Sequence, residues 1–133
     1  MAQFHLQIVT PDGISFDGMA DSVLIRTDTG DVQIMRGHAD YFAPLGIGRA
    51  KIVVGSDEKL ASAQGGFLSV KGGEVRIVAT TFEFAESIDL ARAKRAKEEA
   101  ENALLSAKDE KYIKLAKAKL ARAINRINIA ELI

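Results

Sequence analysis

Hydrophobic and polar residues alternate along the first part of the chain. Phe4, Leu6 and Ile8 alternate with polar neighbours, which is the period of a half-buried strand. Further short apolar runs are separated by turn residues and lie at 23–26, 32–34, 51–54, 60–63, 67–71 and 74–79. Gly72 and Gly73 separate the last two runs and are a strong hairpin signal, because both can take positive φ. Short strands with frequent turns predict a β-sandwich or barrel for residues 1–84.

The periodicity changes to that of a helix after Ser87. Apolar residues recur at helical spacing from Leu90 to Ala107 and again from Ile113 to Ala130, and neither Pro nor Gly interrupts them. A polar stretch breaks the pattern near Asp109. We therefore predict two antiparallel helices joined by a short loop, forming a second domain over residues 85–133. Ser87 is the predicted N-cap of the first helix, with Asp89 in its first turn.

Charge is unevenly distributed, although the formal net charge is zero. From residue 111 to the end, Glu131 is the only acidic residue, and the basic residues are Lys111, Lys114, Lys117, Lys119, Arg122 and Arg126. One interpretation is a solvated helix face. The other is a surface that meets an acidic partner or an anion.

Composition limits the compartment and the chemistry. The chain has no cysteine, which excludes disulfides and thiolate catalysis. No apolar run reaches the ~18 residues of a membrane span, and the N-terminus lacks the pattern of a signal peptide. We therefore expect no transmembrane segment, and a place in the cytoplasm or at the cytoplasmic face of a membrane.

Three arginines are predicted to converge where the helical hairpin begins. If the loop is centred near residue 109, Arg92 faces Arg126, and position 96 faces Arg122. Two guanidinium groups ~5 Å apart repel by ~3 kcal/mol at an effective dielectric near 20, so they splay into solvent or hold an anion. Forked arginine donors beside free helix N-terminal amides suit a polyphosphate. The alternative is that Asp89 and Arg92 form only an exposed pair worth little.

Other constellations favour no catalytic or nucleic-acid-binding function. His38 lies near Asp40, but only His5 accompanies it, on a separate predicted strand, which is a poor basis for a metal site. The pairs at 65–66 and 72–73 are interpreted as turn glycines without the spacing of a phosphate-binding loop. No nucleophile–base set is visible. The basic last helix lacks interleaved aromatics apart from Tyr112, so nucleic acid is not an expected partner.

Four motifs in order resemble the epsilon subunit of bacterial F-type ATP synthases. These are residues 9–13 (Val-Thr-Pro-Asp-Gly), Gly37-His38 followed by residues 43–45 (Ala-Pro-Leu), residues 65–70 (Gly-Gly-Phe-Leu-Ser-Val) and residues 88–93 (Ile-Asp-Leu-Ala-Arg-Ala). Arg36 departs from the pattern, because relatives usually carry proline there. The similarity covers the whole length of the chain.

The resemblance implies an α+β protein with a ten-stranded antiparallel β-sandwich at residues 1–84 and a regulatory helical hairpin at residues 85–133. It implies a non-catalytic subunit of the central rotor, peripheral at the cytoplasmic face of the bacterial cell membrane. The expected partners are the gamma subunit and the c ring. The alpha and beta subunits are expected as further partners when the hairpin is extended and opposes ATP hydrolysis. In that state, acidic segments of the beta subunits are expected to bind the basic helix.

The resemblance also implies a regulatory ligand. In ATP-binding relatives, ATP stabilises the folded hairpin. The residues of this chain at the positions that hold ATP in those relatives are Glu83, Ile88, Asp89, Arg92, Ala93, Arg122 and Arg126. No metal ligand is assigned, and whether Mg²⁺ accompanies ATP is left open. Some ATP-binding relatives have a basic residue where this chain has Glu99, and this difference is expected either to weaken ATP binding or to alter the role of a metal ion. Two other readings stay open, a purely structural coupling subunit and a free-standing nucleotide hydrolase, and the missing phosphate-binding loop argues against the latter.

Overall fold

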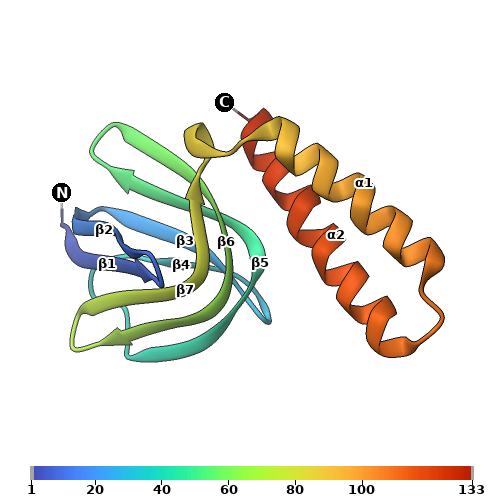
Figure 1. Cartoon of the computed structure of the whole chain (residues 1–133). Helices are drawn as coiled ribbons and strands as arrows, with labels where there is room; N and C mark the ends of the chain where they lie inside the picture. Colours follow the sequence, from blue (N-terminus) through green and yellow to red (C-terminus); the bar gives the residue numbers. More distant parts are fainter. Residues whose placement is uncertain (1, 133) are drawn as a thin grey trace. The chain divides into compact units, whose positions relative to one another are not determined.

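The computed structural model describes residues 2–132, which belong to two compact units, Met1–Phe84 and Ala85–Ile133. Figure 1 shows the elements in order along the chain. The first unit holds seven strands: β1 (Phe4–Thr10), β2 (Gly13–Ala20), β3 (Ser22–Thr27), β4 (Gly30–Ile34), β5 (Tyr41–Val54), β6 (Asp57–Lys71) and β7 (Glu74–Phe84). The second unit holds a 3₁₀ turn, η1 (Ala85–Ser87), and two helices, α1 (Leu90–Ser106) and α2 (Glu110–Glu131).

The strands form one mixed sheet, so the expectation of ten antiparallel strands is wrong. The seven strands lie in the order β2-β1-β7-β6-β5-β3-β4, and β1 runs parallel to β7 while the other pairs are antiparallel. The number differs because β5, β6 and β7 are 14, 15 and 11 residues long. These strands curve through regions where separate shorter strands were expected (Figure 1). The sandwich of the first unit is therefore made by a sheet that folds over its own core.

The pair Gly65-Gly66 makes this folding possible, and its assignment as a turn was wrong. Both glycines lie inside β6, with φ of +71° and +92°. Ala61 and Ala63 are buried before the pair, and the buried positions after it shift to Leu68 and Val70. The side-chain alternation of the strand thus changes phase at the glycines, so both halves of β6 turn apolar residues toward the same core.

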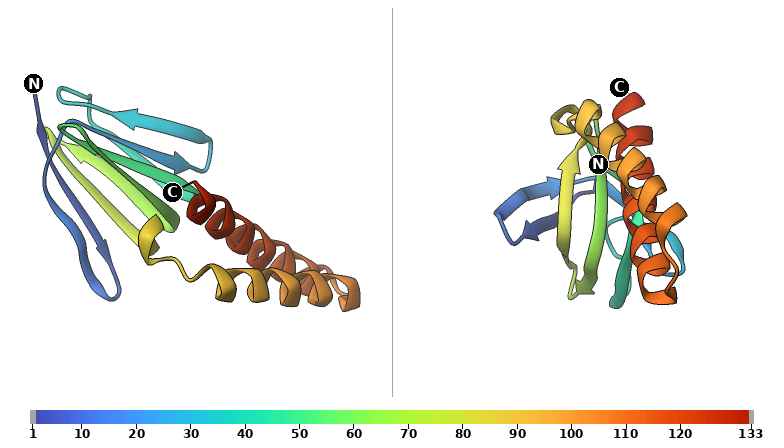
Figure 2. Two further views of the ribbon diagram at one scale, coloured as in Figure 1. Left: turned by 90° about the horizontal axis from the view of Figure 1, so that it is seen from above. Right: turned by 45° about the vertical axis from the view of Figure 1, so that its right-hand side comes forward.

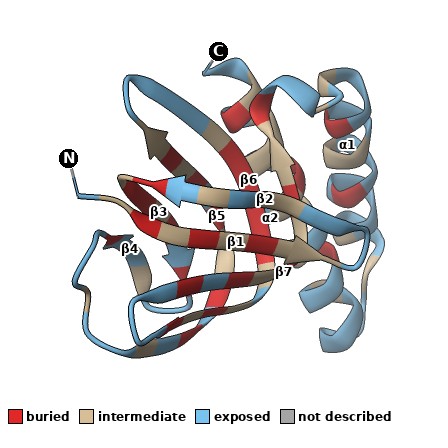
Figure 3. Ribbon diagram, turned by 90° about the vertical axis from the view of Figure 1, so that its left-hand side faces the viewer, coloured by how far each residue is buried: buried red, intermediate tan, exposed pale blue. Residues whose placement is uncertain are grey.

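The core draws on all the strands of the first unit. Its buried apolar residues are Phe4, Leu6, Ile8, Ala20, Val23, Ile25, Ile34, Leu45, Ala50, Ile52, Ala61, Ala63, Leu68, Val70, Val75, Ile77, Ala79 and Phe82. Figure 3 shows the predicted alternation of buried and half-buried positions along β1. The hairpin predicted at Gly72-Gly73 is confirmed, because Lys71 pairs with Glu74 and both glycines have positive φ. Strand β2 was not predicted, since Ser15, Asp17 and Gly18 interrupt its apolar pattern.

The two predicted helices are confirmed and run antiparallel (Figure 2). Their contact buries small side chains, namely Ala93 and Ala100 of α1 and Ala116 and Ala123 of α2. Alanine at these positions lets the helix axes approach closely. Asp109 caps α2 at the predicted break, where its carboxylate accepts from the Lys111 amide at 3.0 Å.

Asp89, and not Ser87, is the N-cap of α1. Asp89 has extended backbone angles, and its side chain accepts a hydrogen bond from the Arg92 amide at 3.0 Å. Ser87 instead closes the single turn η1, in which the Ile88 amide donates to the Ala85 carbonyl at 3.2 Å. The prediction failed because Ser and Asp are both good N-caps, so the residue types alone do not decide which of them begins the helix.

Candidate functional site

The start of α1 presents a carboxylate and a guanidinium on one turn. One oxygen of Asp89 accepts from the Arg92 amide, and the Asp89 carbonyl accepts from the Ala93 amide at 3.0 Å. The side chains of Asp89 and Arg92 are exposed, whereas Ala93 is buried against α2 and Ile88 is half-buried. The second carboxylate oxygen of Asp89 and the Arg92 fork can therefore reach a ligand without unfolding the helix.

A hollow of about 400 Å³ lies between α1 and α2, and we call it the hairpin hollow. The alanines of the helix contact leave its space open. Its lining residues are Ala96, Glu99, Ala100 and Ala103 from α1 and Lys119, Arg122, Ala123 and Arg126 from α2. Three cationic side chains and one carboxylate thus border the hollow, which gives it a positive balance suited to an anion.

The hairpin hollow brings together Arg122 and Arg126 of the predicted ligand set. Position 96 and Arg122, which the facing-residue argument placed opposite each other, both line it. Arg92 lies on the exposed face of the first turn and is not among the lining residues. Glu83 lies in the other unit, near the end of β7, where it pairs in register with Ser62 of β6.

The remaining singled-out residues have local roles. His38 Nδ1 donates to the Ala39 carbonyl oxygen, 2.7 Å away, and the His38 ring meets the Tyr41 ring edge-on at 5.8 Å between centroids. Asp40 accepts from the Gly72 amide at 3.0 Å. On the basic helix the four lysines are exposed, and Arg122 and Arg126 are half-buried.

A second candidate surface was missed by the sequence analysis. Register places one apolar residue from each of five adjacent strands in a row on the face opposite the core, and we call it the outer-face belt. Its members are Ile14 of β2, Val9 of β1, Val78 of β7, Phe67 of β6 and Pro44 of β5, with Phe42 stacked on Phe67 at 5.2 Å between ring centroids. Ile14 is 63% exposed and Phe42 is 66% exposed. A contiguous apolar row of this kind typically marks a protein interface.

The signal for the belt is present in the sequence but depends on pairing. In β1, β5, β6 and β7 the belt residue is next to a core residue in sequence, so two apolar residues stand together where alternation would place one. Ile14 of β2 has no core residue beside it. Only the pairing register of the five strands shows that the belt residues lie side by side.

Comparison with known proteins places both units in one family. Residues 3–85 match the model described as ATP synthase, Delta/Epsilon chain, beta-sandwich domain. Residues 86–131 match ATP synthase, Delta/Epsilon chain, long alpha-helix domain. The chain is 40% identical over 130 residues to the ATP synthase epsilon chain of Bacillus velezensis, with 98% of each chain covered. The chain belongs to the epsilon subunits of bacterial F-type ATP synthases.

A second relative agrees with this assignment, and two solved structures share the fold. The ATP synthase epsilon chain of Halalkalibacterium halodurans is 38% identical over 131 residues, covering 98% of both chains. The fold resembles a chain in the Euglena gracilis mitochondrial ATP synthase structure with OSCP, F1 and c-ring, with a TM-score of 0.84 at 24% identity, covering 100% of this chain and 83% of that one. The fold also resembles a chain in the Tetrahymena thermophila mitochondrial ATP synthase central stalk and c-ring structure, with a TM-score of 0.67 at 16% identity and 95% of both chains covered. Among residues 2–132, no helix is long and apolar enough to cross a bilayer.

Proposed function

We propose that this epsilon subunit senses ATP with its helical hairpin and thereby regulates ATP hydrolysis by the synthase. The subunit itself catalyses nothing. The observation that carries the proposal is the hairpin hollow, in which Arg122 and Arg126 border one cavity together with Lys119. A guanidinium group can donate two parallel hydrogen bonds to the oxygens of one phosphate. The first turn of α1 adds the second carboxylate oxygen of Asp89, which could bind a ribose, a base or an accompanying Mg²⁺.

Binding across the two helices would stabilise the folded hairpin. If the extended hairpin cannot bind ATP, the folded form gains RT ln(1 + [ATP]/Kd), which is ~2.7 kcal/mol at a hundredfold excess. That amount moves a balanced equilibrium to about 99:1. Linkage then requires that docking of the extended hairpin on the alpha and beta subunits weaken ATP binding by the same factor.

The test is ATP hydrolysis by the assembled synthase at low and high ATP. With the wild-type subunit, inhibition should be strong at low ATP and relieved at high ATP. With Arg92→Ala plus Arg122→Ala, inhibition should persist at high ATP, because the folded form loses its ligand. Arg95→Ala is the matched control, since Arg95 is exposed on α1 and lies outside the hollow. Equal relief in the double variant and the wild type would contradict the proposal.

A purely structural coupling subunit is the second candidate function, and Glu99 favours it. Glu99 places a carboxylate on the hollow that the phosphates of ATP would have to enter. In that case inhibition by the wild-type subunit would not respond to ATP, and Glu99→Arg would be expected to create the response.

We further propose that the outer-face belt docks on the gamma subunit and that the first unit also contacts the c ring, at the cytoplasmic face of the bacterial membrane. Apolar residues from five strands give this face the character of an interface core. Ile14→Asp with Phe42→Asp should abolish binding to purified gamma subunit, because both side chains are exposed and the core is untouched. Leu105→Asp, at an 85% exposed position of α1, should bind gamma as the wild type does.

A further inference from the structure

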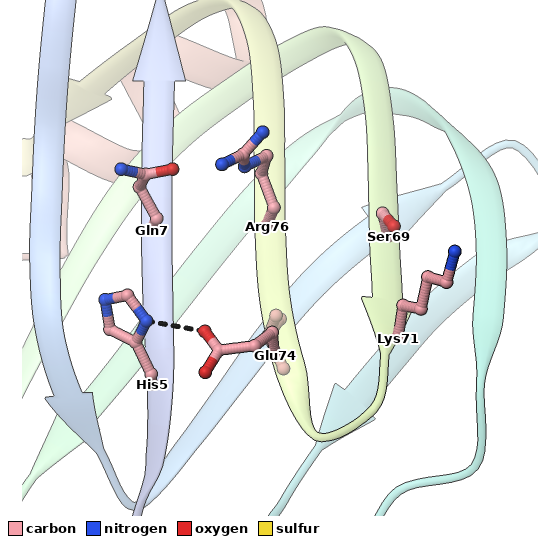
Figure 4. A pocket seen from close by; sticks show the side chains of 7 residues that line it. His5, Gln7, Ser69, Lys71, Glu74 and Arg76 are labelled. Atoms are coloured by element: carbon pink, nitrogen blue, oxygen red, sulfur yellow. Dashed lines mark hydrogen bonds and ion pairs between the residues drawn. The ribbon is translucent and has the colours of Figure 1, made fainter.

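A polar recess of about 330 Å³ lies on the same face as the outer-face belt, and we call it the outer-face recess. Figure 4 shows its labelled side chains, which come from β1, β6 and β7: His5, Gln7, Ser69, Lys71, Glu74 and Arg76. Arg76 pairs in register with Gln7 and Ser69, and Val78 pairs with Val9 and Phe67 of the belt. The two rows are therefore only two residues, or about 7 Å, apart along each strand.

The carboxylates of this region are already engaged by one imidazole. His5 Nε2 lies 2.5 Å from Asp17 Oδ1, and His5 Nδ1 lies 2.6 Å from Glu74 Oε2. Both ring nitrogens must donate for both contacts to be favourable, so this geometry is that of an imidazolium. The hydrogen bonds that the His5 ring donates to Asp17 and Glu74 accordingly raise the pKa of His5.

The cations of the recess are not engaged in this way. Across residues 2–132, neither Lys71 nor Arg76 forms an ion pair or side-chain hydrogen bond. The nearby carboxylate of Asp40 accepts from the Gly72 amide instead of pairing with Lys71. We call His5 and its two carboxylate partners, Asp17 and Glu74, the His5 clasp. With His5 protonated, the recess and the clasp together carry three positive and two negative groups, which leaves a net positive charge next to the outer-face belt.

We propose that the outer-face recess receives a side-chain carboxylate of the rotor subunit whose apolar surface covers the belt. This inference rests on the proposed docking of the belt. Arg76 offers a planar fork that matches a carboxylate, and Lys71 adds a second positive charge on the other side of Ser69. A carboxylate beside apolar side chains on the partner would fix which way the two surfaces meet, since charge placement sets the register of an interface more than its affinity. The His5 clasp keeps Asp17 and Glu74 from repelling that carboxylate.

The test measures binding of the full chain to purified gamma subunit at low and high salt. Arg76→Gln with Lys71→Gln should weaken binding about tenfold at low salt and flatten its salt dependence, because the attraction that salt screens has been removed. Lys51→Gln is the matched control, since Lys51 lies outside the recess and pairs with Glu58 at 3.8 Å. His5→Gln should also weaken binding, and wild-type binding should weaken as pH rises through the raised pKa of His5.

The outcomes separate this inference from the docking proposal. If the belt variants lose binding while Arg76→Gln with Lys71→Gln binds as the wild type does, the inference is overturned and the docking stands. An equal loss for Lys51→Gln would show general electrostatic attraction and would also overturn it. If the belt variants bind gamma normally, the docking itself is wrong.

Discussion

Replacing Gly66 by alanine tests the explanation given for the folded sheet. Gly66 has φ of +92°, and a Cβ there would lie 1.8 Å from the Val78 carbonyl oxygen and 3.0 Å from the Ala79 Cα. Both neighbours are backbone atoms of a paired strand, so they cannot move away as a flexible side chain would. A left-handed backbone costs a non-glycine residue about 1–2 kcal/mol, and overpacking costs about 1–3 kcal/mol more. We expect Gly66→Ala to destabilise the first unit by about 3 kcal/mol or more.

Gly55→Ala is the matched control. Gly55 also has positive φ, at +62°, but an added Cβ would meet nothing within 4 Å, so only the backbone cost of about 1–2 kcal/mol remains. Urea unfolding in a Tyr112→Phe background would report on the first unit alone, because Tyr41 is then the only fluorescent tyrosine and the chain has no Trp. At a slope of about 2 kcal/mol per molar urea, the two midpoints should differ by about 1 M. Equal midpoints would refute the close-approach argument.

Three further predictions concern the cap, the core and the clasp. Asp89→Ala should lower hairpin stability by about 1 kcal/mol in thermal unfolding, whereas Asp89→Asn should not, because the amide oxygen still caps α1. Leu68→Ala, at a fully buried site, should cost about 2–5 kcal/mol in the same urea assay, and Met35→Ala, at a 57% exposed site of the same unit, should change stability by less than about 0.5 kcal/mol. His5 should titrate above its ordinary pKa of 6.5 by NMR, while the pKa of Asp17 lies below its ordinary 3.8. The clasp therefore stabilises the fold between these limits and is lost as pH rises through the raised His5 pKa or falls through the lowered Asp17 pKa, and His5→Gln should remove that dependence.

Local patterns predicted the elements whose signals are contained in a few neighbouring residues. The alternation at Phe4, Leu6 and Ile8 gave β1, the glycine pair at 72–73 gave a hairpin, and the helical spacing after Ser87 gave both helices. The folded sheet was not predictable in the same way. The pair Gly65-Gly66 looks like a turn in sequence, and only its pairing with β7 shows a continuous strand that changes phase.

The candidate sites likewise divide into one that local sequence spacing predicts and two that depend on long-range strand pairing. Counting residues from the loop placed Arg122 opposite position 96, and both line the hairpin hollow, because helix geometry is regular enough for such a count. The outer-face belt and the outer-face recess combine residues from strands far apart in the chain, such as Val9 and Val78. Their positions depend on a parallel pairing of β1 with β7 that no local pattern reveals.

Isothermal titration of the full chain with ATP, with and without Mg²⁺, is the sharpest test of ATP sensing by the hairpin. A hairpin that senses ATP should give saturable binding that is lost in Arg92→Ala with Arg122→Ala and retained in Arg95→Ala, at equal helix content by circular dichroism. No heat at millimolar ATP, or full binding by the double variant, would contradict a hairpin that senses ATP through the residues at its hollow and first turn.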